Sequence, residues 1–326
     1  MAGMLRLEED KQAYTVLDPG AGTGILSAAV ILEICKRAPA CKQIFLTCYE
    51  NNPTFLPSLY DNLERIRKKC RHDYGVRLYS TVYEESEARF EEQLSLMEQC
   101  DDSMDLIVLP EYSDVLADVK GKAGYYDTVN KYNAELLEKA KGTAKRCSAM
   151  VFVNAGYETT EGIRNTTYAI NRSGDVVGRY FKAHPAPSEV KTDAEGGHEL
   201  DVRYSYEYNP PYIIEMEGIR FAFLTCYDFY FYENFAPLAR QNIDVIIGCS
   251  HQRTDTHEAL SIINRFLCYN TNAYLIRSSV SLGLDSKICG CSSIIAPDGE
   301  VLVDMRSDVG VACADIDPHA KYYKAA

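Results

Sequence analysis

The sequence predicts an α/β protein in two parts: a βαβα segment over residues 1–75, then a sandwich of two facing sheets with outer helices over residues 76–326. Two patterns predict this. Up to residue 75, two strands alternate with two helices, an order typical of a parallel sheet. Beyond it come many short strands, and the turns SGD at 173–175 and PDG at 297–299 indicate antiparallel hairpins. Hairpins mixed with helical crossovers favour a sandwich.

The elements of the first part alternate strand, helix, strand, helix. They are predicted at residues 14–17, 25–37, 43–49 and 54–69, with a glycine turn at 18–24. A strand at 76–82 could belong to either part, but it cannot serve both sheets. The later strands are predicted at 105–109, 150–154, 166–170, 176–181, 220–225, 245–248, 273–277, 292–296 and 301–304. The later helices are predicted at 84–99, 128–146, 233–241 and 257–270.

Composition limits the class of protein. A hydrophobic content of 46% and a charged content of 25% are those of a globular chain with a sizeable core. The net charge of −13 argues against a nucleic-acid partner, which needs a basic face. Without a signal-like start or a long apolar run, we expect a cytoplasmic protein with no membrane partner. The twelve cysteines are scattered and lack zinc-site spacing, so reduced thiols and no metal are expected.

One hexapeptide occurs almost twice, as FLTCYE at 45–50 and FLTCYD at 223–228. The first copy follows a glycine loop, in which Gly20, Gly22 and Gly24 let backbone amides approach a ligand. Glu50 ends the next strand, where an acid can accept hydrogen bonds from ribose hydroxyls. These residues indicate a nucleoside-binding loop, and Cys48 is interpreted as a core residue of the strand.

The run DPGAGTG together with Glu50 resembles the S-adenosylmethionine pocket of class I methyltransferases, most closely that of N6-adenine DNA methyltransferases. The resemblance covers about residues 10–80 and implies a partial Rossmann-like segment. It implies a vestigial S-adenosylmethionine site, with cofactor-binding residues Asp18, Gly20, Gly22, Gly24 and Glu50. The NPPY at 209–212 matches a further motif of that family. A polar run, YSYEY, precedes it instead of an apolar strand, so a chance match is favoured.

The second copy places Cys226 at a turn between a strand and a helix. A thiol at a helix N-terminus has a lowered pKa, although a merely buried cysteine is the alternative. Glu111 and Lys182 also follow predicted strands. Singly, each would be interpreted as a solvated loop charge. Together they are complementary, because a carboxylate can take the thiol proton and an ammonium can stabilise an oxyanion.

The runs DLIVLPEYSD, GRYFKAHPAP, FLTCYDFYFYENF and APDGEVLVDM, in this order, resemble the nitrilase (carbon–nitrogen hydrolase) superfamily. The resemblance implies an αββα sandwich that commonly dimerises, and a covalent acyl intermediate on cysteine without metal or organic cofactor. By position, it implies Glu111 as general base, Lys182 as stabiliser of the tetrahedral intermediate and Cys226 as nucleophile. Glu189 is a candidate second catalytic glutamate, with a surface acid as the alternative. The family's opening strand usually carries a glutamine, which VRLYSTV lacks.

The leading hypothesis is therefore a thiol-dependent hydrolase of a small non-peptide amide or nitrile, with a homodimer or higher homo-oligomer expected. The alternatives are an S-adenosylmethionine-dependent N6-adenine methyltransferase that uses the glycine loop and NPPY, and an inactive fusion remnant. Under the leading hypothesis, the charged atoms of Glu111 and Lys182 are expected within about 3–5 Å of the Cys226 sulfur.

Overall fold

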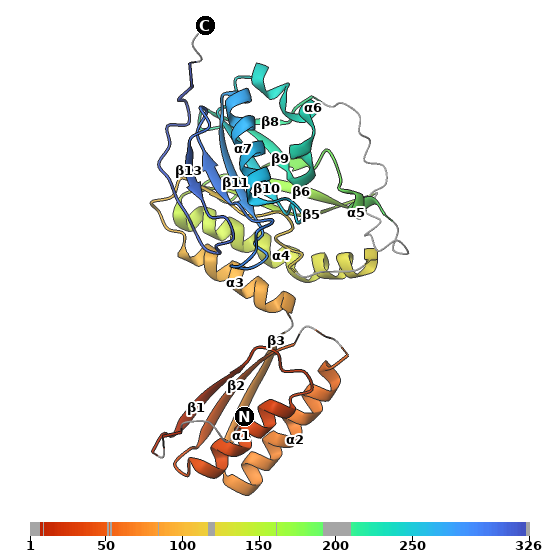
Figure 1. Ribbon diagram of the computed structural model, residues 1–326, viewed down its shortest axis with the longest axis vertical. Coiled ribbons are helices and arrows are strands. Elements are labelled where there is room, and N and C mark those ends of the chain that lie inside the picture. The colour runs from red at the N-terminus through yellow and green to blue at the C-terminus, as the bar shows by residue number, and fades with distance from the viewer. Residues whose placement is uncertain are drawn as a thin grey trace. The chain divides into compact units, whose positions relative to one another are not determined.

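The computed structural model describes residues 7–8, 10–50, 52, 54–83, 85–116, 121–160, 162–191 and 210–323. The chain divides into two compact units, Met1–Glu91 and Glu92–Ala326 (Figure 1). Within the described part of the chain, no helix combines the length and the apolarity needed to cross a membrane.

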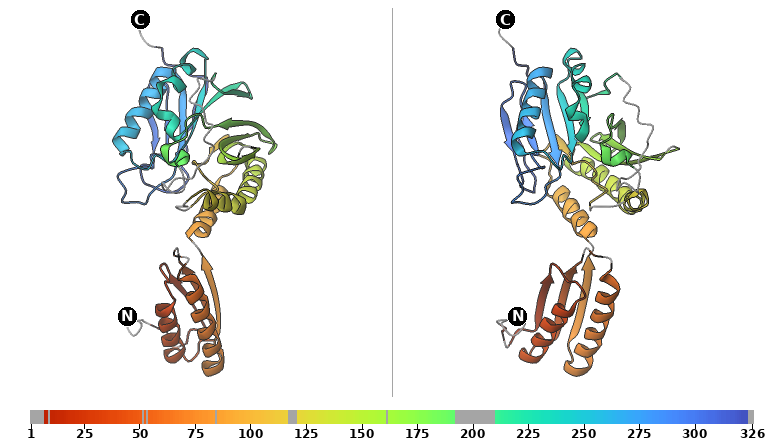
Figure 2. Two further views of the ribbon diagram at one scale, coloured as in Figure 1. Left: turned by 90° about the vertical axis from the view of Figure 1, so that its right-hand side faces the viewer. Right: turned by 45° about the vertical axis from the view of Figure 1, so that its right-hand side comes forward.

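The first unit is a parallel three-stranded sheet with two helices. Its strands β1 (Ala13–Asp18), β2 (Gln43–Tyr49) and β3 (Arg77–Tyr83) lie in that order. Helices α1 (Ile25–Arg37) and α2 (Leu56–Tyr74) connect them and lie on one face of the sheet (Figures 1 and 2). The predicted βαβα order is present, and α1 and β2 have the predicted limits.

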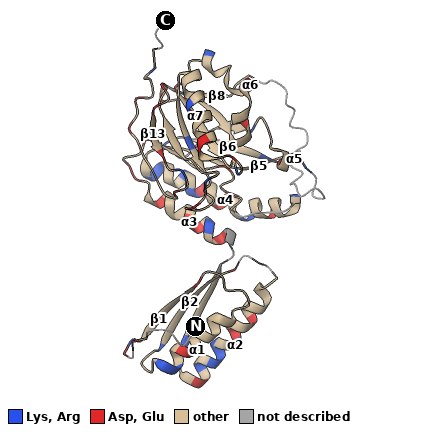
Figure 3. Cartoon of the chain, in the orientation of Figure 1, with Lys and Arg blue, Asp and Glu red and all other residues tan. Residues whose placement is uncertain are grey.

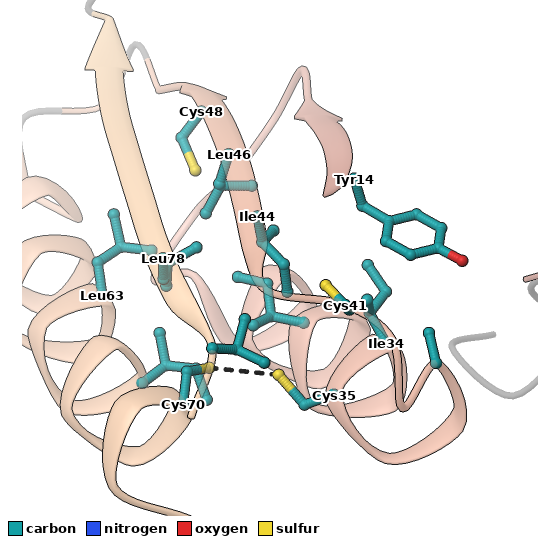
Figure 4. Close-up of a cluster of buried hydrophobic side chains, with 14 of the residues drawn as sticks. Tyr14, Ile34, Cys35, Cys41, Ile44, Leu46, Cys48, Leu63, Cys70 and Leu78 are labelled. Carbon is teal, nitrogen blue, oxygen red and sulfur yellow. Dashed lines mark hydrogen bonds between the residues drawn. The ribbon is translucent and has the colours of Figure 1, made fainter. Parts of the chain in front are cut away.

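The core of this unit forms between β2 and the helices. Alternate residues Ile44, Leu46 and Cys48 point to the helical face, as a strand requires, and all three are buried (Figure 4). The interpretation of Cys48 as a core residue is confirmed. On the opposite face, exposed Phe45 stacks on exposed Tyr79 with ring centroids 5.1 Å apart.

The strand predicted at 76–82, which could have belonged to either part, is β3 of the three-stranded sheet in the first unit. β3 pairs in parallel with β2 over seven residue pairs, from Gln43↔Arg77 to Tyr49↔Tyr83. Gly75 ends α2 in the left-handed region at φ 69°, which glycine adopts without strain, and Leu78 then enters the core. The sheets of the second unit are therefore built without β3.

Helix α2 ends in a basic run, RIRKKCRH at 65–72, and most of its charges have acidic partners on the same helix. Arg65, Arg67 and Lys69 pair with acids one helical turn away, and their side chains are exposed. Figure 3 shows basic and acidic residues together along this helix. These are ordinary solvated helix pairs, which water and salt screen, so they contribute little to stability.

The second unit contains two sheets. The first has the order β4-β5-β6-β7, with strands Leu106–Val108, Met150–Thr159, Gly162–Ile170 and Val176–Phe181. The second has the order β13-β12-β11-β10-β9-β8. Its strands, numbered from β8 to β13, are Ile213–Met216, Ile219–Thr225, Val245–Ser250, Tyr274–Ser279, Ser293–Ile295 and Val301–Asp304.

A shared apolar core joins the two sheets. Phe152 of β5 contacts Phe221 and Phe223 of β9, with ring centroids 5.1 Å and 5.8 Å apart. Helix α4 (Gly121–Cys147) packs on the first sheet, and α7 (His257–Thr271) packs on the second. Helix α3 (Glu85–Gln99) precedes β4. The layers therefore follow the predicted order of helix, sheet, sheet and helix (Figure 2).

The turns and short elements of the second unit confirm some local predictions and correct others. The SGD and PDG turns do join antiparallel pairs, β6 with β7 and β12 with β13. The helix predicted at 233–241 is wrong, because Pro237 divides it into α6 (Tyr232–Phe235) and a 3-10 turn, η4 (Leu238–Arg240). Strand β8 and the short helix α5 (Pro187–Val190) were not predicted.

Candidate active site

Cys226 occupies a sharp bend between a strand and a 3-10 turn. β9 ends at Thr225, and η3 (Cys226–Tyr230) follows directly. The φ of Cys226 is 48°, in the left-handed region that non-glycine residues rarely adopt. Such strain persists only where the surroundings enforce it, and it is frequent at functional sites.

Asp228 enforces the bend. Its Oδ2 accepts hydrogen bonds from the Thr225 amide at 2.9 Å and the Tyr180 hydroxyl at 2.8 Å. Its Oδ1 accepts one from the His184 amide at 2.8 Å. The carboxylate is completely buried. It therefore joins the bend at Cys226 to β7 and the chain just beyond it, where Lys182 lies.

Glu111 and Lys182 meet as the motifs predict. Glu111 follows β4 and Lys182 follows β7, and Lys182 Nζ lies 2.8 Å from Glu111 Oε1. A second carboxylate, that of Glu189 on α5, lies 2.7 Å from the same Nζ. Since Glu189 is buried and paired, the surface-acid alternative for it is wrong. The ammonium lies between two buried carboxylates.

Asn165 on β6 completes this cluster, and no sequence motif indicated it. Its Nδ2 donates to Glu111 Oε1 at 2.8 Å and to Glu189 Oε1 at 3.2 Å. Asn154 on β5 donates to Asn165 Oδ1 at 2.8 Å and thereby orients the amide. The Tyr112 hydroxyl donates to Glu189. The only signal in the sequence is polar residues inside otherwise buried strands, because such residues need buried partners.

The charges of the cluster stabilise one another. Burial opposes the charge of Lys182, yet Glu111 and Glu189 raise its pKa well above the ordinary value. Burial also opposes the charge of Glu189, but Lys182 and the hydrogen bonds from Tyr112 and the Ala186 amide lower its pKa. Glu111 differs: burial and the charge of Glu189 raise its pKa, against the opposing effect of Lys182. Glu111 is therefore the more basic carboxylate.

Cys226 adjoins Glu111 but is not a preformed thiolate. Burial raises the pKa of its thiol well above the ordinary value, the charge of Glu111 raises it further, and Lys182 opposes both. The expected lowering by a helix N-terminus is wrong, because η3 has only five residues and the pocket is desolvated. No N–H or O–H donor of the described residues reaches the buried Glu111 Oε2. That oxygen is available to accept a proton, and the thiol lies close to this carboxylate, since Cys226 and Glu111 each shift the pKa of the other.

In the first unit, the two acids beside the glycine loop already accept hydrogen bonds from the protein's own groups. Glu50 accepts hydrogen bonds from the amides of Gly22 and Asn52, one on each carboxylate oxygen. Asp18 accepts hydrogen bonds from the Ser27 hydroxyl and the Gly20 amide. Both acids predicted to serve a cofactor thus accept hydrogen bonds from the loop and from residues beside it. Asn209 of NPPY and the loop at 204–208 lie outside the described residues.

Residues 74–322 match the family model for carbon-nitrogen hydrolases. The chain belongs to the carbon–nitrogen hydrolase family. It is a carbon–nitrogen hydrolase, and its mixed α/β fold is consistent with that of the nitrilase superfamily. The match begins within the first unit and includes β3. No comparison gives evidence of a methyltransferase-like segment before it, and no curated protein matches the chain.

Solved structures of this family share the fold at low identity. A cysteine-to-alanine mutant of an amidase of the nitrilase superfamily from Nesterenkonia AN1 is 14% identical, with a TM-score of 0.53; the match covers 68% of this chain and 81% of that one. The carbon–nitrogen hydrolase XC1258 from Xanthomonas campestris, with an arsenic adduct in its active site, is 16% identical, with a TM-score of 0.52 and coverage of 69% and 82%. Other structures of the Nesterenkonia amidase hold acrylamide, or the acetamide moiety of fluoroacetamide added covalently to the active-site cysteine.

Proposed function

We propose that this hydrolase cleaves the C–N bond of a small non-peptide amide through a covalent acyl intermediate on Cys226. The observation that carries the proposal is the arrangement of Lys182 between Glu111 and Glu189, with the strained Cys226 beside Glu111. The amides bound by the structurally similar Nesterenkonia amidase support the substrate class. A nitrile remains the alternative substrate.

The proposed first half-reaction begins with a neutral thiol. As the Cys226 sulfur attacks the carbonyl carbon, Glu111 takes the thiol proton, so no free thiolate has to exist in the buried pocket. The carbonyl oxygen gains negative charge, and the Lys182 ammonium stabilises it. When the intermediate collapses, the C–N bond breaks and Glu111 returns its proton to the leaving amine. The acyl group remains on sulfur as a thioester.

The second half-reaction uses the same groups. Water attacks the thioester carbon while Glu111 takes one of its protons, and Lys182 again faces the oxyanion. The C–S bond breaks, the proton returns to sulfur, and a carboxylic acid leaves. Glu189 and Asn165 are positioning residues in this scheme, because they hold Lys182 and Glu111 in place. No step requires a metal or an organic cofactor.

Fluoroacetamide tests the nucleophile directly. We expect the intact protein to gain one acetamide moiety, with loss of fluoride, and peptide mapping to place it on Cys226. Cys226→Ala should gain none, and ammonia release from acetamide or butyramide should stop with it. Label on Cys48, or ammonia release that survives Cys226→Ala, would contradict the assignment.

We propose, in addition, that the glycine loop is a vestigial site that does not bind S-adenosylmethionine tightly. The residues do not fit the cofactor as they stand, because Glu50 would have to release the Gly22 and Asn52 amides before accepting ribose hydroxyls. Calorimetry should detect no binding at micromolar concentrations. A micromolar Kd that is lost in Glu50→Ala, with the fold retained by circular dichroism, would favour the methyltransferase alternative instead.

A further inference from the structure

Arg277 of β11 is a buried arginine that packs against the turn carrying Cys226. Arg277 is only 2% exposed, and its guanidinium lies over the Phe229 ring of η3, with its Cζ 5.7 Å from the ring centroid. Burial lowers the pKa of Arg277, and the Cys226 sulfur is one of the groups that oppose this lowering, so the two side chains are close. A buried charge costs stability, yet neither proposed half-reaction uses this one. Its hydrogen bonds show which segments it holds.

The guanidinium of Arg277 bonds to two separate segments at once. Its Nη1 donates to the carbonyls of Gly290 and Cys291 at 3.0 Å and 2.8 Å. Its Nη2 donates to Ser250 Oγ at 2.8 Å and to Gln252 Oε1 at 3.0 Å. These four bonds use four of its five N–H donors, whereas a lysine ammonium has only three. Arg277 therefore fixes the end of β10 against the turn that supplies the two carbonyls.

The carbonyls that accept from Nη1 lie in a left-handed turn. Cys289, Gly290 and Cys291 have φ values of 62°, 67° and 58°. Only glycine adopts this region freely, so the two cysteines hold it because other contacts enforce it. The Cys289 amide donates to the Asp255 carbonyl at 2.9 Å, which ties this turn to the chain that follows β10. Nη1 is thus bonded to a fixed support.

His251 lies between the two residues that Nη2 holds. Ser250 ends β10, and its hydroxyl also donates to Gln252 Oε1 at 2.9 Å, so the side chains on both sides of His251 are joined to each other and to Arg277. Burial raises the pKa of the Cys226 thiol, and the His251 backbone opposes this, so its amide lies close to the sulfur. A backbone N–H directed at sulfur stabilises negative charge there. The position of this amide therefore depends on residues that Arg277 holds.

Gln252 also joins this segment to the turn that carries the nucleophile. Its Nε2 donates to Asp255 Oδ2 at 3.2 Å, and the Tyr230 hydroxyl donates to the same oxygen. Tyr230 is the last residue of η3, which begins at Cys226. The hydrogen-bond network of Arg277 thus reaches both ends of that short turn, through the His251 amide at one end and through Tyr230 at the other.

We propose that Arg277 is a positioning residue of the hydrolase: it holds segment 250–252 so that the His251 amide faces the Cys226 sulfur. Since Cys226 is taken as the nucleophile, this assignment rests on the proposed function. Sulfur gains negative charge when the thiol loses its proton, and again when the C–S bond of the thioester breaks. A fixed amide beside the sulfur assists both steps, because it needs no reorganisation as that charge develops.

Alkylation of Cys226 by iodoacetamide tests this role without requiring turnover. Its rate at Cys226 is measured by peptide mapping as a function of pH. Arg277→Lys keeps the charge but cannot make all four hydrogen bonds, so the His251 amide should move away. The pKa of the thiol should then rise by about one unit, and labelling should slow about tenfold at every pH below that pKa. The whole rate profile should shift to higher pH with its slope unchanged.

Arg146→Lys is the matched control, because the Arg146 guanidinium also donates to two backbone carbonyls, those of Met97 and Cys100. It makes the same exchange of a guanidinium for an ammonium at the end of α3, outside the network around Cys226. The labelling profile should not shift. A profile that shifted equally in Arg146→Lys would mean that the effect is one of general loosening, and would overturn the proposal.

Gln252→Met tests the path from Arg277 to the sulfur. It should also slow labelling, and the double variant with Arg277→Lys should be little slower than the slower single variant, because both act through one segment. Arg277→Lys that labels at the unmodified rate would show that charge alone suffices and would overturn the proposal, as would single effects that multiply. If circular dichroism shows Arg277→Lys to be unfolded, Gln252→Met decides alone by the same criterion. Failure of the proposed function is distinct, since hydrolysis would then survive Cys226→Ala.

Discussion

Cys226→Ala is expected to lower kcat/KM for amide hydrolysis by roughly 10⁴–10⁶-fold, the loss typical when a covalent nucleophile is removed. The fold should persist. Cys226 contributes little packing, and alanine can adopt the same strained φ at little additional cost, so the free energy of unfolding should change by at most about 1 kcal/mol. Ammonia release and urea unfolding measure the two quantities on the same samples.

Cys48→Ala is the matched control, because the same LTCY context surrounds both cysteines. Cys48 is fully buried between β2 and the helices, and burial raises the pKa of its thiol. The substitution should cost about 1–2 kcal/mol of stability and leave kcat/KM unchanged. If Cys48→Ala removed activity and Cys226→Ala did not, the nucleophile would have been assigned to the wrong copy.

Lys182→Met should both inactivate and destabilise the second unit. Methionine has similar length but no charge, so Glu111 and Glu189 would share a buried site without the ammonium that now lies 2.8 Å and 2.7 Å from them. Removing one partner from a buried ionic cluster costs about 3–5 kcal/mol. Urea unfolding at pH 7 should show this loss, and hydrolysis should be undetectable because the oxyanion loses its stabilising charge.

The cost of Lys182→Met should depend on pH. Without the ammonium, the two carboxylates repel, and the folded variant binds a proton more tightly than the unfolded chain, whose glutamates have a pKa of about 4.3. The folded state then holds more protons, so the variant's free energy of unfolding falls as pH rises above that value. The deficit relative to the unmodified protein should be larger at pH 8 than at pH 5.

Lys139→Met is the control for this substitution. Lys139 pairs with Glu98 at 2.5 Å, but both side chains are partly or largely exposed. The cost should be at most about 1 kcal/mol and should fall with added salt. A Lys182→Met variant as stable as Lys139→Met, or equally stable at pH 5 and pH 8, would contradict the charge distribution described for the site.

Local patterns in the sequence were sufficient for most of the second unit's strands. β7 and β13 have the predicted limits, because each begins just after a turn, SGD or PDG, and neighbouring residues are enough to specify such a start. The sequence patterns did not predict the hairpin β8–β9. Glu217 and Gly218, both at positive φ, form its two-residue turn, and the pair EG could have indicated it.

By itself, the sequence determined that Glu111, Lys182 and Cys226 follow strand ends and that Cys48 is buried, since motif order and period-two alternation are properties of short segments. Tertiary structure alone decided four further points: the burial of Glu189 against Lys182, the role of Asn165, the raised pKa of Cys226 and the pairing of β3 with β2. Each depends on desolvation or on contacts between residues distant in the chain. Judged from its local sequence, a short strand such as β3 could join either sheet. Its register and its burial in the whole fold decide which sheet it joins.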